Sequence, residues 1–314
     1  MPKHIGILLL IGRCLGAQTS AAAHRPVFDV HQHAVFTPAG TDAMMASMDS
    51  LNVRHAVYIG SFEQLSALPD TTSRHLIPAL MFPCDGGRMP NAGVTCFPGA
   101  GTDFPDVQWL RQQVKAHRIE MFGEIGAQYL GIAPNDARLE PYFALAEELD
   151  VPVGIHLGIG PPAVAYPDTP FPAFKSPRYR GAAGDPYLLE DVLVRHPKLR
   201  VYAMHAAWPE IERMLYLMCM HPQLYVDISV LQYAIARPAY MIALKTLVDA
   251  GLSDRIMFGS DGGPRFVAMG IDAIEKAPFL SEKQKSDILY DNAMRFFRND
   301  QAAAVKLPSR VCGS

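Results

Sequence analysis

Val27-Phe-Asp-Val-His-Gln-His33 is a short apolar run that closes on two histidines. His31 and His33 are two positions apart, so both side chains leave the same face of an extended strand. Seven further short apolar runs follow along the chain. Apolar runs that lack a polar face are typical of parallel strands buried on both sides. The seven runs are 56–59, 76–81, 120–124, 153–156, 201–205, 224–228 and 256–259.

Amphipathic segments separate these runs, and their apolar residues recur at helical spacing. Two of them end in His-Pro, which stops a helix because the residue before proline avoids the helical region. Eight strands that alternate with helices predict an α/β protein with a single-domain (β/α)8 TIM barrel. An open doubly wound sheet is the alternative, and the lack of a glycine-rich phosphate loop after the first strand weakens it. The predicted helices are 106–117, 139–149, 187–196, 210–221, 239–250 and 281–297.

The composition is that of a globular protein. The chain has 314 residues, of which 49% are hydrophobic and 19% are charged. That length supports one large core, and the apolar fraction is too high for a disordered chain. The formal net charge of −3 provides no basic excess, so no nucleic-acid partner is expected.

Residues 1–23 are expected to be an export signal. A basic start, the apolar run 5–11 and the small residues Ala21-Ala-Ala23 follow the order that such signals have. No later segment is apolar over the roughly 20 residues that cross a bilayer, so the mature chain should have no membrane span. The expected location is periplasmic or secreted, or cytoplasmic if this segment is not a signal. The barrel is then predicted over 24–300, with a tail expected to be disordered over 301–314.

Histidines and carboxylates lie where the predicted strands end. In a barrel of parallel strands these ends meet at one mouth, which is where such barrels keep their active sites. Any one of these residues is more commonly a hydrogen-bonded core residue, but the whole set favours a metal site. Imidazole and carboxylate ligands suit zinc, manganese or iron. The residues at strand ends are Asp29, His31, His33, Glu124, His156, His205 and Asp261, whereas the remaining histidines are interpreted as structural or as part of the signal.

The motifs that carry these residues resemble the metal-dependent amidohydrolase superfamily. The similarity is strongest to the amidohydrolase-related branch, which also holds aminocarboxymuconate-semialdehyde decarboxylase. It covers Val27 to Phe297 and implies a (β/α)8 barrel with one or two divalent metals. The motifs are 28–33 (FDVHQH), 122–126 (FGEIG), 152–156 (PVGIH), 202–209 (YAMHAAWP) and 256–261 (IMFGSD).

The resemblance also implies a role for each ligand. His31, His33 and Asp261 would hold a first metal, while His156 and His205 would hold a second, with Glu124 as the bridge. In one-metal members of the family, the residue that matches His205 transfers protons instead. A carboxylate bridges the metals in two-metal hydrolases of this kind, and no lysine lies in the fourth predicted strand to replace Glu124, so two metals are favoured.

This set of residues predicts a metal-dependent hydrolase. A divalent metal lowers the pKa of bound water to about 7 and so provides hydroxide at neutral pH. Asp261 would then take the proton of the attacking water and pass it to the leaving group. The expected substrate is a small-molecule ester, lactone, amide or phosphoester. A metal-dependent decarboxylase in which His205 protonates carbon is the alternative, and a non-catalytic metal-binding barrel is a third. Homo-oligomer formation is left open.

Substrate selection is expected from two long loops, 83–105 and 158–186. Arg178 and Arg180 could hold an anionic group, or they could be solvated. Trp208 could line the pocket or simply pack. Asp227 is either an acceptor for a ligand histidine or part of a strand-end ion pair.

Four cysteines remain after removal of the signal. Cys84 and Cys96 share the first long loop and could form a disulfide in an oxidising compartment. The alternative is a pair of reduced thiols. Cys219 is expected in the core and Cys312 in the tail.

Overall fold

The computed structural model describes residues 25–33, 38–68, 75–88, 94–99, 101–297 and Cys312. The predicted signal lies outside the described residues, as does the predicted tail apart from Cys312. Eight parallel strands form one sheet in sequence order. The strands are β1 (Val27–His33), β2 (Val53–Gly60), β3 (His75–Phe82), β4 (Met121–Ile125), β5 (Val153–His156), β6 (Val201–Met204), β7 (Leu224–Asp227) and β8 (Ile256–Met257).

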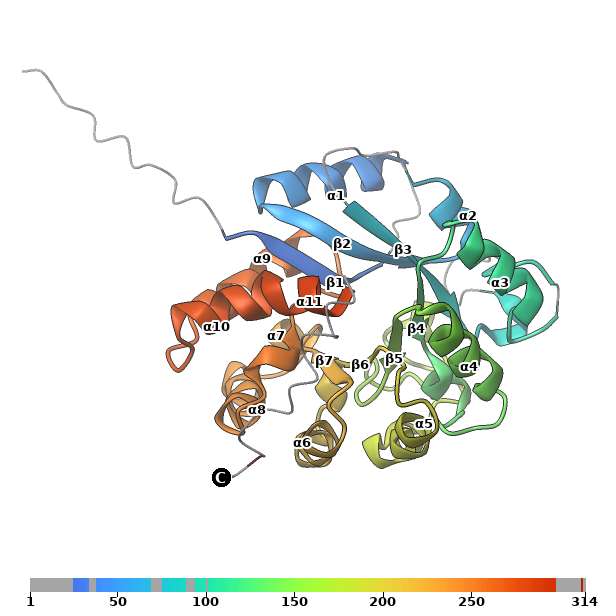
Figure 1. Cartoon of the computed structure of the whole chain (residues 1–314). Helices are drawn as coiled ribbons and strands as arrows, with labels where there is room; N and C mark the ends of the chain where they lie inside the picture. Colours follow the sequence, from blue (N-terminus) through green and yellow to red (C-terminus); the bar gives the residue numbers. More distant parts are fainter. Residues whose placement is uncertain are drawn as a thin grey trace, which may run out of the picture.

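The sheet curves into a nearly closed barrel (Figure 1). Backbone hydrogen bonds link the first strand to the chain that follows the last one. Val30 N donates to Phe258 O at 3.0 Å, and Asp261 N donates to His31 O at 2.7 Å. The predicted (β/α)8 barrel is therefore confirmed.

Helices surround the barrel (Figure 1). Each predicted helix is present, although the segment 281–297 is divided into α10, a π-helical turn at Asp287–Asp291 and α11. Helices α1, α2, α7 and α9 were not predicted. The helices are α1 (Pro38–Ser50), α2 (Phe62–Ser66), α3 (Val107–Lys115), α4 (Glu140–Leu149), α5 (Glu190–Arg195), α6 (Ile211–Met220), α7 (Leu231–Ala234), α8 (Arg237–Asp249), α9 (Pro264–Glu275), α10 (Glu282–Ser286) and α11 (Asn292–Phe297).

Large apolar side chains fill the barrel interior and form a floor beneath the strand ends. Met121, Tyr202 and Met204 are fully buried there. Gly154 leaves them room, because a Cβ atom at this position would lie 2.5 Å from Met204 Cε and 2.6 Å from Met121 Cε. The Tyr202 hydroxyl donates to Val30 O at 2.8 Å, so the one polar atom of this side chain is satisfied. The side chains at the strand ends therefore lie directly above a closely packed apolar layer.

Two disulfides are present among the described cysteines. Cys84 and Cys96 are bridged with their Cα atoms 6.6 Å apart, which confirms the pairing considered from the sequence. Cys219 is bridged to Cys312, which corrects the expectation of a core thiol and an unattached tail cysteine. Cys219 is only half-buried on α6, so a second cysteine can reach it. This pairing joins positions 93 residues apart and ties Cys312 to the barrel.

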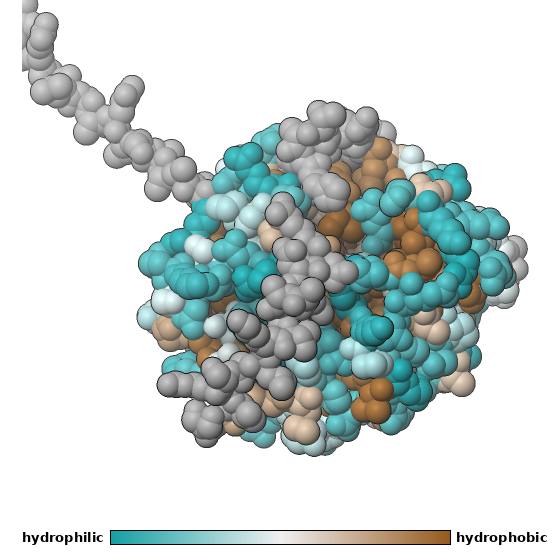
Figure 2. Space-filling view, viewed as in Figure 1, coloured by the Kyte–Doolittle hydropathy of each residue, from teal (hydrophilic) through white to brown (hydrophobic). Residues whose placement is uncertain are grey.

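The outer surface is largely polar. Figure 2 shows a mostly hydrophilic face on which hydrophobic residues form separate patches. In the part of the chain that the structure describes, no helix combines the length and the apolarity that a membrane crossing requires.

Candidate metal centre

The six side chains predicted as metal ligands converge at one mouth of the barrel. Each comes from the carboxyl end of a strand or from the residues just after it: β1, β4, β5, β6 and β8. Most of them are fully buried, whereas the side chain of His33 is 32% exposed and that of Asp261 is 18% exposed. These two residues therefore mark the open side of the site. The six are His31, His33, Glu124, His156, His205 and Asp261.

Four donor atoms lie close together, and we call them the first donor set: His31 Nε2, His33 Nε2, Glu124 Oε2 and Asp261 Oδ1. Around a tetrahedral ion with bonds of about 2.0–2.1 Å, neighbouring donor atoms lie about 3.3–3.4 Å apart. Five of the six separations within the set lie between 3.0 and 3.7 Å, close to that value, so these donors fit a divalent ion. They are His31–His33 3.3 Å, His33–Glu124 3.3 Å, His33–Asp261 3.0 Å, His31–Asp261 3.5 Å and His31–Glu124 3.7 Å.

Glu124 also reaches a second group of donors. Its Oε1 lies 2.5 Å from His156 Nδ1, which in turn lies 3.2 Å from His205 Nε2. We call these three residues the second donor set, and they too could hold an ion. His156 Nε2 is buried and has no hydrogen-bond partner among the described residues. Glu124 thus stands between the two sets with one oxygen toward each, as expected of a bridging carboxylate.

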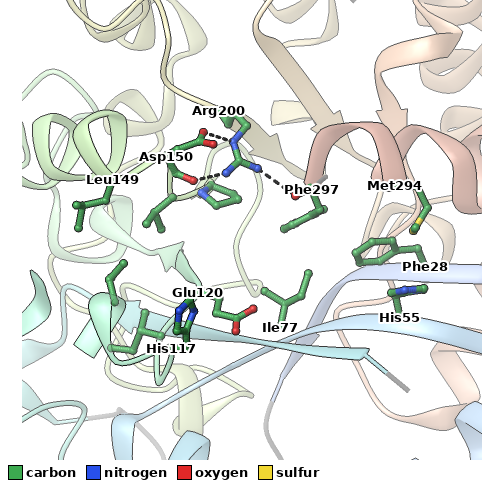
Figure 3. Close-up of a pocket in the computed structure, with 14 residues that line it drawn as sticks. Phe28, His55, Ile77, His117, Glu120, Leu149, Asp150, Arg200, Met294 and Phe297 are labelled. Carbon is green, nitrogen blue, oxygen red and sulfur yellow. Dashed lines mark hydrogen bonds and ion pairs between the residues drawn. The ribbon is translucent and has the colours of Figure 1, made fainter. Parts of the chain in front are cut away.

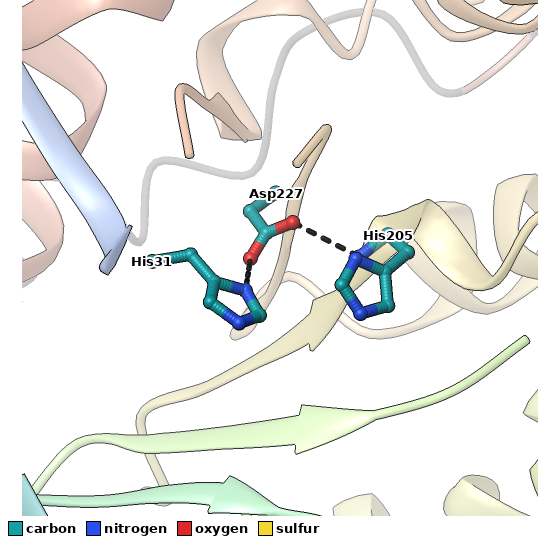
Figure 4. Close-up of side chains that lie close together, drawn as sticks. All are labelled: His31, His205 and Asp227. Carbon is teal, nitrogen blue, oxygen red and sulfur yellow. Dashed lines mark hydrogen bonds and ion pairs between the residues drawn. The ribbon is translucent and has the colours of Figure 1, made fainter. Parts of the chain in front are cut away.

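Asp227, at the end of β7, holds two of the histidines in place. Its Oδ2 accepts from His31 Nδ1 at 3.0 Å, and its Oδ1 accepts from the backbone N of His205 at 2.9 Å (Figure 4). The Ser229 hydroxyl lies 2.9 Å from His205 Nδ1 and donates to Asp227 Oδ1 at 2.6 Å. Because the Nδ1 atom of each ring is engaged, Nε2 is left for the centre. The acceptor role considered for Asp227 is confirmed.

A second buried carboxylate, Asp29, ties β1 to the segment that carries Asp261. Asp29 Oδ1 accepts from Ser260 N at 2.9 Å and from His31 N at 3.1 Å, and Gln32 Nε2 donates to Oδ2 at 3.2 Å. Burial raises the pKa of Asp29 to about 6, against the opposing effect of these hydrogen bonds. Asp29 therefore fixes the relative positions of ligands from the first and last strands.

The carboxylates determine the charge of the histidines. Burial opposes protonation of His33, but its hydrogen bonds to Asp261 and Glu124 outweigh burial and raise its pKa to about 9. The pKa of His31 is raised in the same way, mainly by Asp261 and Asp227. By contrast, burial and the neighbouring His156 lower the pKa of His205 to about 4. Positive charge is thus favoured at the first donor set, where a metal ion can replace the protons.

The residues predicted to bind substrate contact the loops and the core of the protein. The Arg178 guanidinium pairs with Asp85 at 2.7 Å and with Asp103 at 3.4 Å, so it links the two long loops. Arg180 donates to the backbone carbonyls of Pro177 and Tyr179. Trp208 is partly buried against the core. Among the described contacts, none joins these side chains to the six at the centre, and their substrate-binding role stays a prediction.

Two tyrosines near the centre were not predicted. The ring of Tyr129 lies 4.8 Å from that of His156 and 5.4 Å from that of Tyr179. Burial, followed by the charges of Glu124 and Asp261, raises the pKa of Tyr129 well above its ordinary value, so the phenol stays neutral. Tyr129 follows Glu124 by five positions in the loop after β4. The only sequence feature that pointed to Tyr129 was its place in the loop shortly after a strand-end ligand.

A cavity of about 530 Å³ lies at the opposite end of the barrel (Figure 3). It is lined by residues at or just before the starts of strands, such as Glu120 and Pro152. Arg200 in its wall is buried and donates to Asp150 and to the backbone carbonyls of Phe296 and Phe297. The donors of Arg200 are thus used within the protein, and this cavity is separate from the six converging side chains.

Comparisons with known proteins agree with this architecture. The sequence model of the family described as "Amidohydrolase" matches residues 23–298. No curated protein matches the chain. An uncharacterised TIM-barrel protein from Bordetella bronchiseptica is similar in structure, with a TM-score of 0.61 at 15% identity, over 87% of this chain and 98% of the other.

Two further solved structures are similar over 87% of this chain and 99% of their own. One is a probable 2-pyrone-4,6-dicarboxylic acid hydrolase from Acinetobacter baumannii, with a TM-score of 0.56 at 15% identity. The other is a 5-carboxyvanillate decarboxylase from Sphingomonas paucimobilis, with a TM-score of 0.53 at 13% identity. At these identities the likeness concerns the fold.

Replacing Asp227 by asparagine should weaken Zn²⁺ binding by about 10–100-fold, because His31 and His205 lose the charge that orients them. Competition with a chromophoric chelator measures this affinity. Asp249→Asn, which removes a carboxylate paired with Lys245 on the surface of α8, is the matched control and should leave the affinity unchanged. Equal affinities in the two variants would contradict the orienting role.

Zn²⁺ binding should release protons at neutral pH. His33 has a pKa of about 9, above its ordinary value of 6.5. Its protonation therefore stabilises the metal-free protein fully below pH 6.5, and this stabilisation is lost as the pH rises through 9. Over the same interval the apparent Zn²⁺ affinity should rise, by up to about tenfold per pH unit for each displaced proton. Calorimetry in buffers of different ionisation enthalpy measures the release, and an affinity independent of pH from 6.5 to 8.5 would rule it out.

Proposed function

Because the chain belongs to the amidohydrolase family, whose sequence model spans residues 23–298, we propose that it is a metal-dependent hydrolase of a small-molecule ester, lactone, amide or phosphoester. The observation that carries the proposal is the first donor set, whose separations of 3.0–3.7 Å match ligands around one ion. Glu124 extends this set toward His156 and His205. The proposed site thus has places for two ions that share one carboxylate.

The metal is proposed to be zinc, with manganese or iron as alternatives. All donors at the centre are imidazole nitrogens or carboxylate oxygens, which these ions accept. The four cysteines that the structure describes are held in disulfides, so none of them offers a thiolate.

A divalent ion in this site supplies a Lewis acid for the substrate oxygen and an activated water. The residues of the chain transfer the proton and orient the ligands. Asp261 lies at the open side with its Oδ1 in the first donor set, while its Oδ2 lies 4.0 Å from His205 Nε2. Asp261 can therefore accept the proton of the attacking water and deliver it to the leaving group. Asp227 and Asp29 keep the ligands oriented during this transfer.

A metal-dependent decarboxylase is the second candidate. It is supported by one feature of the site: the first donor set has four donors without His156 or His205. His205 would then be available to protonate carbon as carbon dioxide leaves. The similar structure of a 5-carboxyvanillate decarboxylase also supports this candidate.

Metal stoichiometry and a substrate screen test the proposal. Purified protein should contain two divalent ions per chain and should hydrolyse members of an ester, lactone, amide and phosphoester panel. Glu124→Gln removes the bridging charge, so it should release one ion and lower kcat by more than the 10–100-fold typical of residues that only orient ligands.

Glu120→Gln is the matched control, since Glu120 precedes the same strand but lines the cavity at the other end of the barrel. It should keep both ions and full activity. If Glu124→Gln retains its metal content and activity, the bridging assignment fails. One ion per chain together with decarboxylation of aromatic acids would favour the second candidate.

We further propose that the chain is exported and acts in the periplasm or outside the cell. The two disulfides support this location, because they persist in oxidising compartments. In a bacterial host, protein from the periplasmic fraction should lack residues 1–23 by intact mass and should have no free thiol. Full-length protein with reduced cysteines in the cytosol would contradict export.

A further inference from the structure

Tyrosine hydroxyls near the centre differ in how they are used. Tyr179 donates to Gly158 O at 2.7 Å, and Tyr233 donates to Asp261 O at 2.8 Å. Tyr202, beneath the site, is likewise bonded to a backbone carbonyl. The hydroxyl of Tyr129, by contrast, has no hydrogen-bond partner within the ranges that the structure describes. Three of the four hydroxyls therefore bond to the protein backbone, whereas the Tyr129 hydroxyl remains able to donate a hydrogen bond to a ligand.

The position of Tyr129 is tightly defined. It lies in the 3₁₀ turn Ala127–Leu130, directly after the strand that carries Glu124, and its backbone N donates to Gly126 O at 3.0 Å. Its ring packs between His156, at 4.8 Å, and Tyr179, at 5.4 Å. Tyr129 is half-buried, so part of it is in contact with solvent. A rigid ring thus carries an unused donor at the edge of the second donor set.

We propose that Tyr129 is a catalytic residue whose hydroxyl donates a hydrogen bond to the substrate oxygen that gains negative charge during the reaction. This inference rests on the proposed hydrolase function and deepens it. A donor that is fixed before the reaction stabilises developing charge without reorganisation, and burial strengthens the effect. The carboxylates of Glu124 and Asp261 are negatively charged acceptors and would repel a substrate oxygen that gains negative charge. A phenol is a neutral hydrogen-bond donor and can stabilise that oxygen.

The same geometry narrows the substrate to a carbonyl compound. A single neutral donor matches the one negative charge that appears on a carbonyl oxygen during attack on an ester, lactone or amide. A phosphoester carries more charge and calls for cationic partners. Arg178, the arginine expected to bind anions, is already paired with Asp85 and Asp103.

Tyr129→Phe tests the proposal because it removes one oxygen and keeps both ring contacts. With the best ester or lactone of the panel, kcat should fall about 10²–10³-fold, the loss typical of one oxyanion donor, while KM changes by less than about threefold. Metal content and Tm should stay at the wild-type values. Tyr187→Phe, which removes the hydroxyl of a 43% exposed tyrosine, is the matched control and should leave kcat unchanged.

A binding measurement provides a readout independent of turnover. Acetohydroxamate, titrated into the Zn²⁺-loaded protein, presents a carbonyl oxygen and an anionic oxygen at the metal. Tyr129→Phe should raise its Kd about 10–100-fold, as expected for loss of a hydrogen bond to a charged group.

An unchanged kcat and Kd in Tyr129→Phe would overturn the proposal. Loss of metal from this variant would also overturn it, since Tyr129 would then support the ligands. A rise in KM alone would make Tyr129 a binding residue and contradict the catalytic role. If the wild-type protein hydrolyses no member of the panel, the hydrolase proposal fails, and the acetohydroxamate titration still decides whether Tyr129 donates to a metal-bound oxygen ligand.

Discussion

The burial of the Glu124 and Asp261 carboxylates among imidazoles is the constraint on which the rest of the structure depends. An ionised carboxylate removed from water is strongly destabilising unless a positive partner is close. In the metal-free chain the partners are protons on His31 and His33, whose pKa values are raised for this reason. A divalent ion bound by these residues would take the place of the protons. The attraction between the buried carboxylates and a positive partner therefore accounts both for the stability of this end of the barrel and for its ability to bind a metal ion.

The remaining architecture keeps these charges in position. The packed interior blocks water from below, and Gly154 provides the space that this packing requires. Asp227 orients His31 and His205, and Asp29 joins the first strand to the segment that follows the last. Removing either carboxylate leaves every ligand present but less well directed. Two buried carboxylates thus connect ligand-bearing segments that come from different strands.

The sequence predicts the strands and the six converging residues because both depend on local pattern and on one rule, that parallel strands end at the same mouth. It cannot predict contacts that depend on how distant loops pack. Arg178 pairs with Asp85 across the two long loops, which turns an apparent anion-binding residue into a link between them. The Cys219–Cys312 disulfide likewise depends on how segments distant in the sequence pack together. Tyr129 was overlooked because an aromatic residue in a loop has no distinctive spacing, and helix α1 because its small residues make a weak apolar stripe.

X-ray absorption spectroscopy of the Zn²⁺-loaded protein tests the central claim most directly, because it reports the atoms bound to the ion. The account predicts a shell of nitrogen and oxygen atoms at about 2.0–2.1 Å, with the outer-shell scattering that imidazole rings produce. His33→Ala should reduce that imidazole contribution. A sulfur shell at about 2.3 Å, or a spectrum without imidazole scattering, would contradict the account.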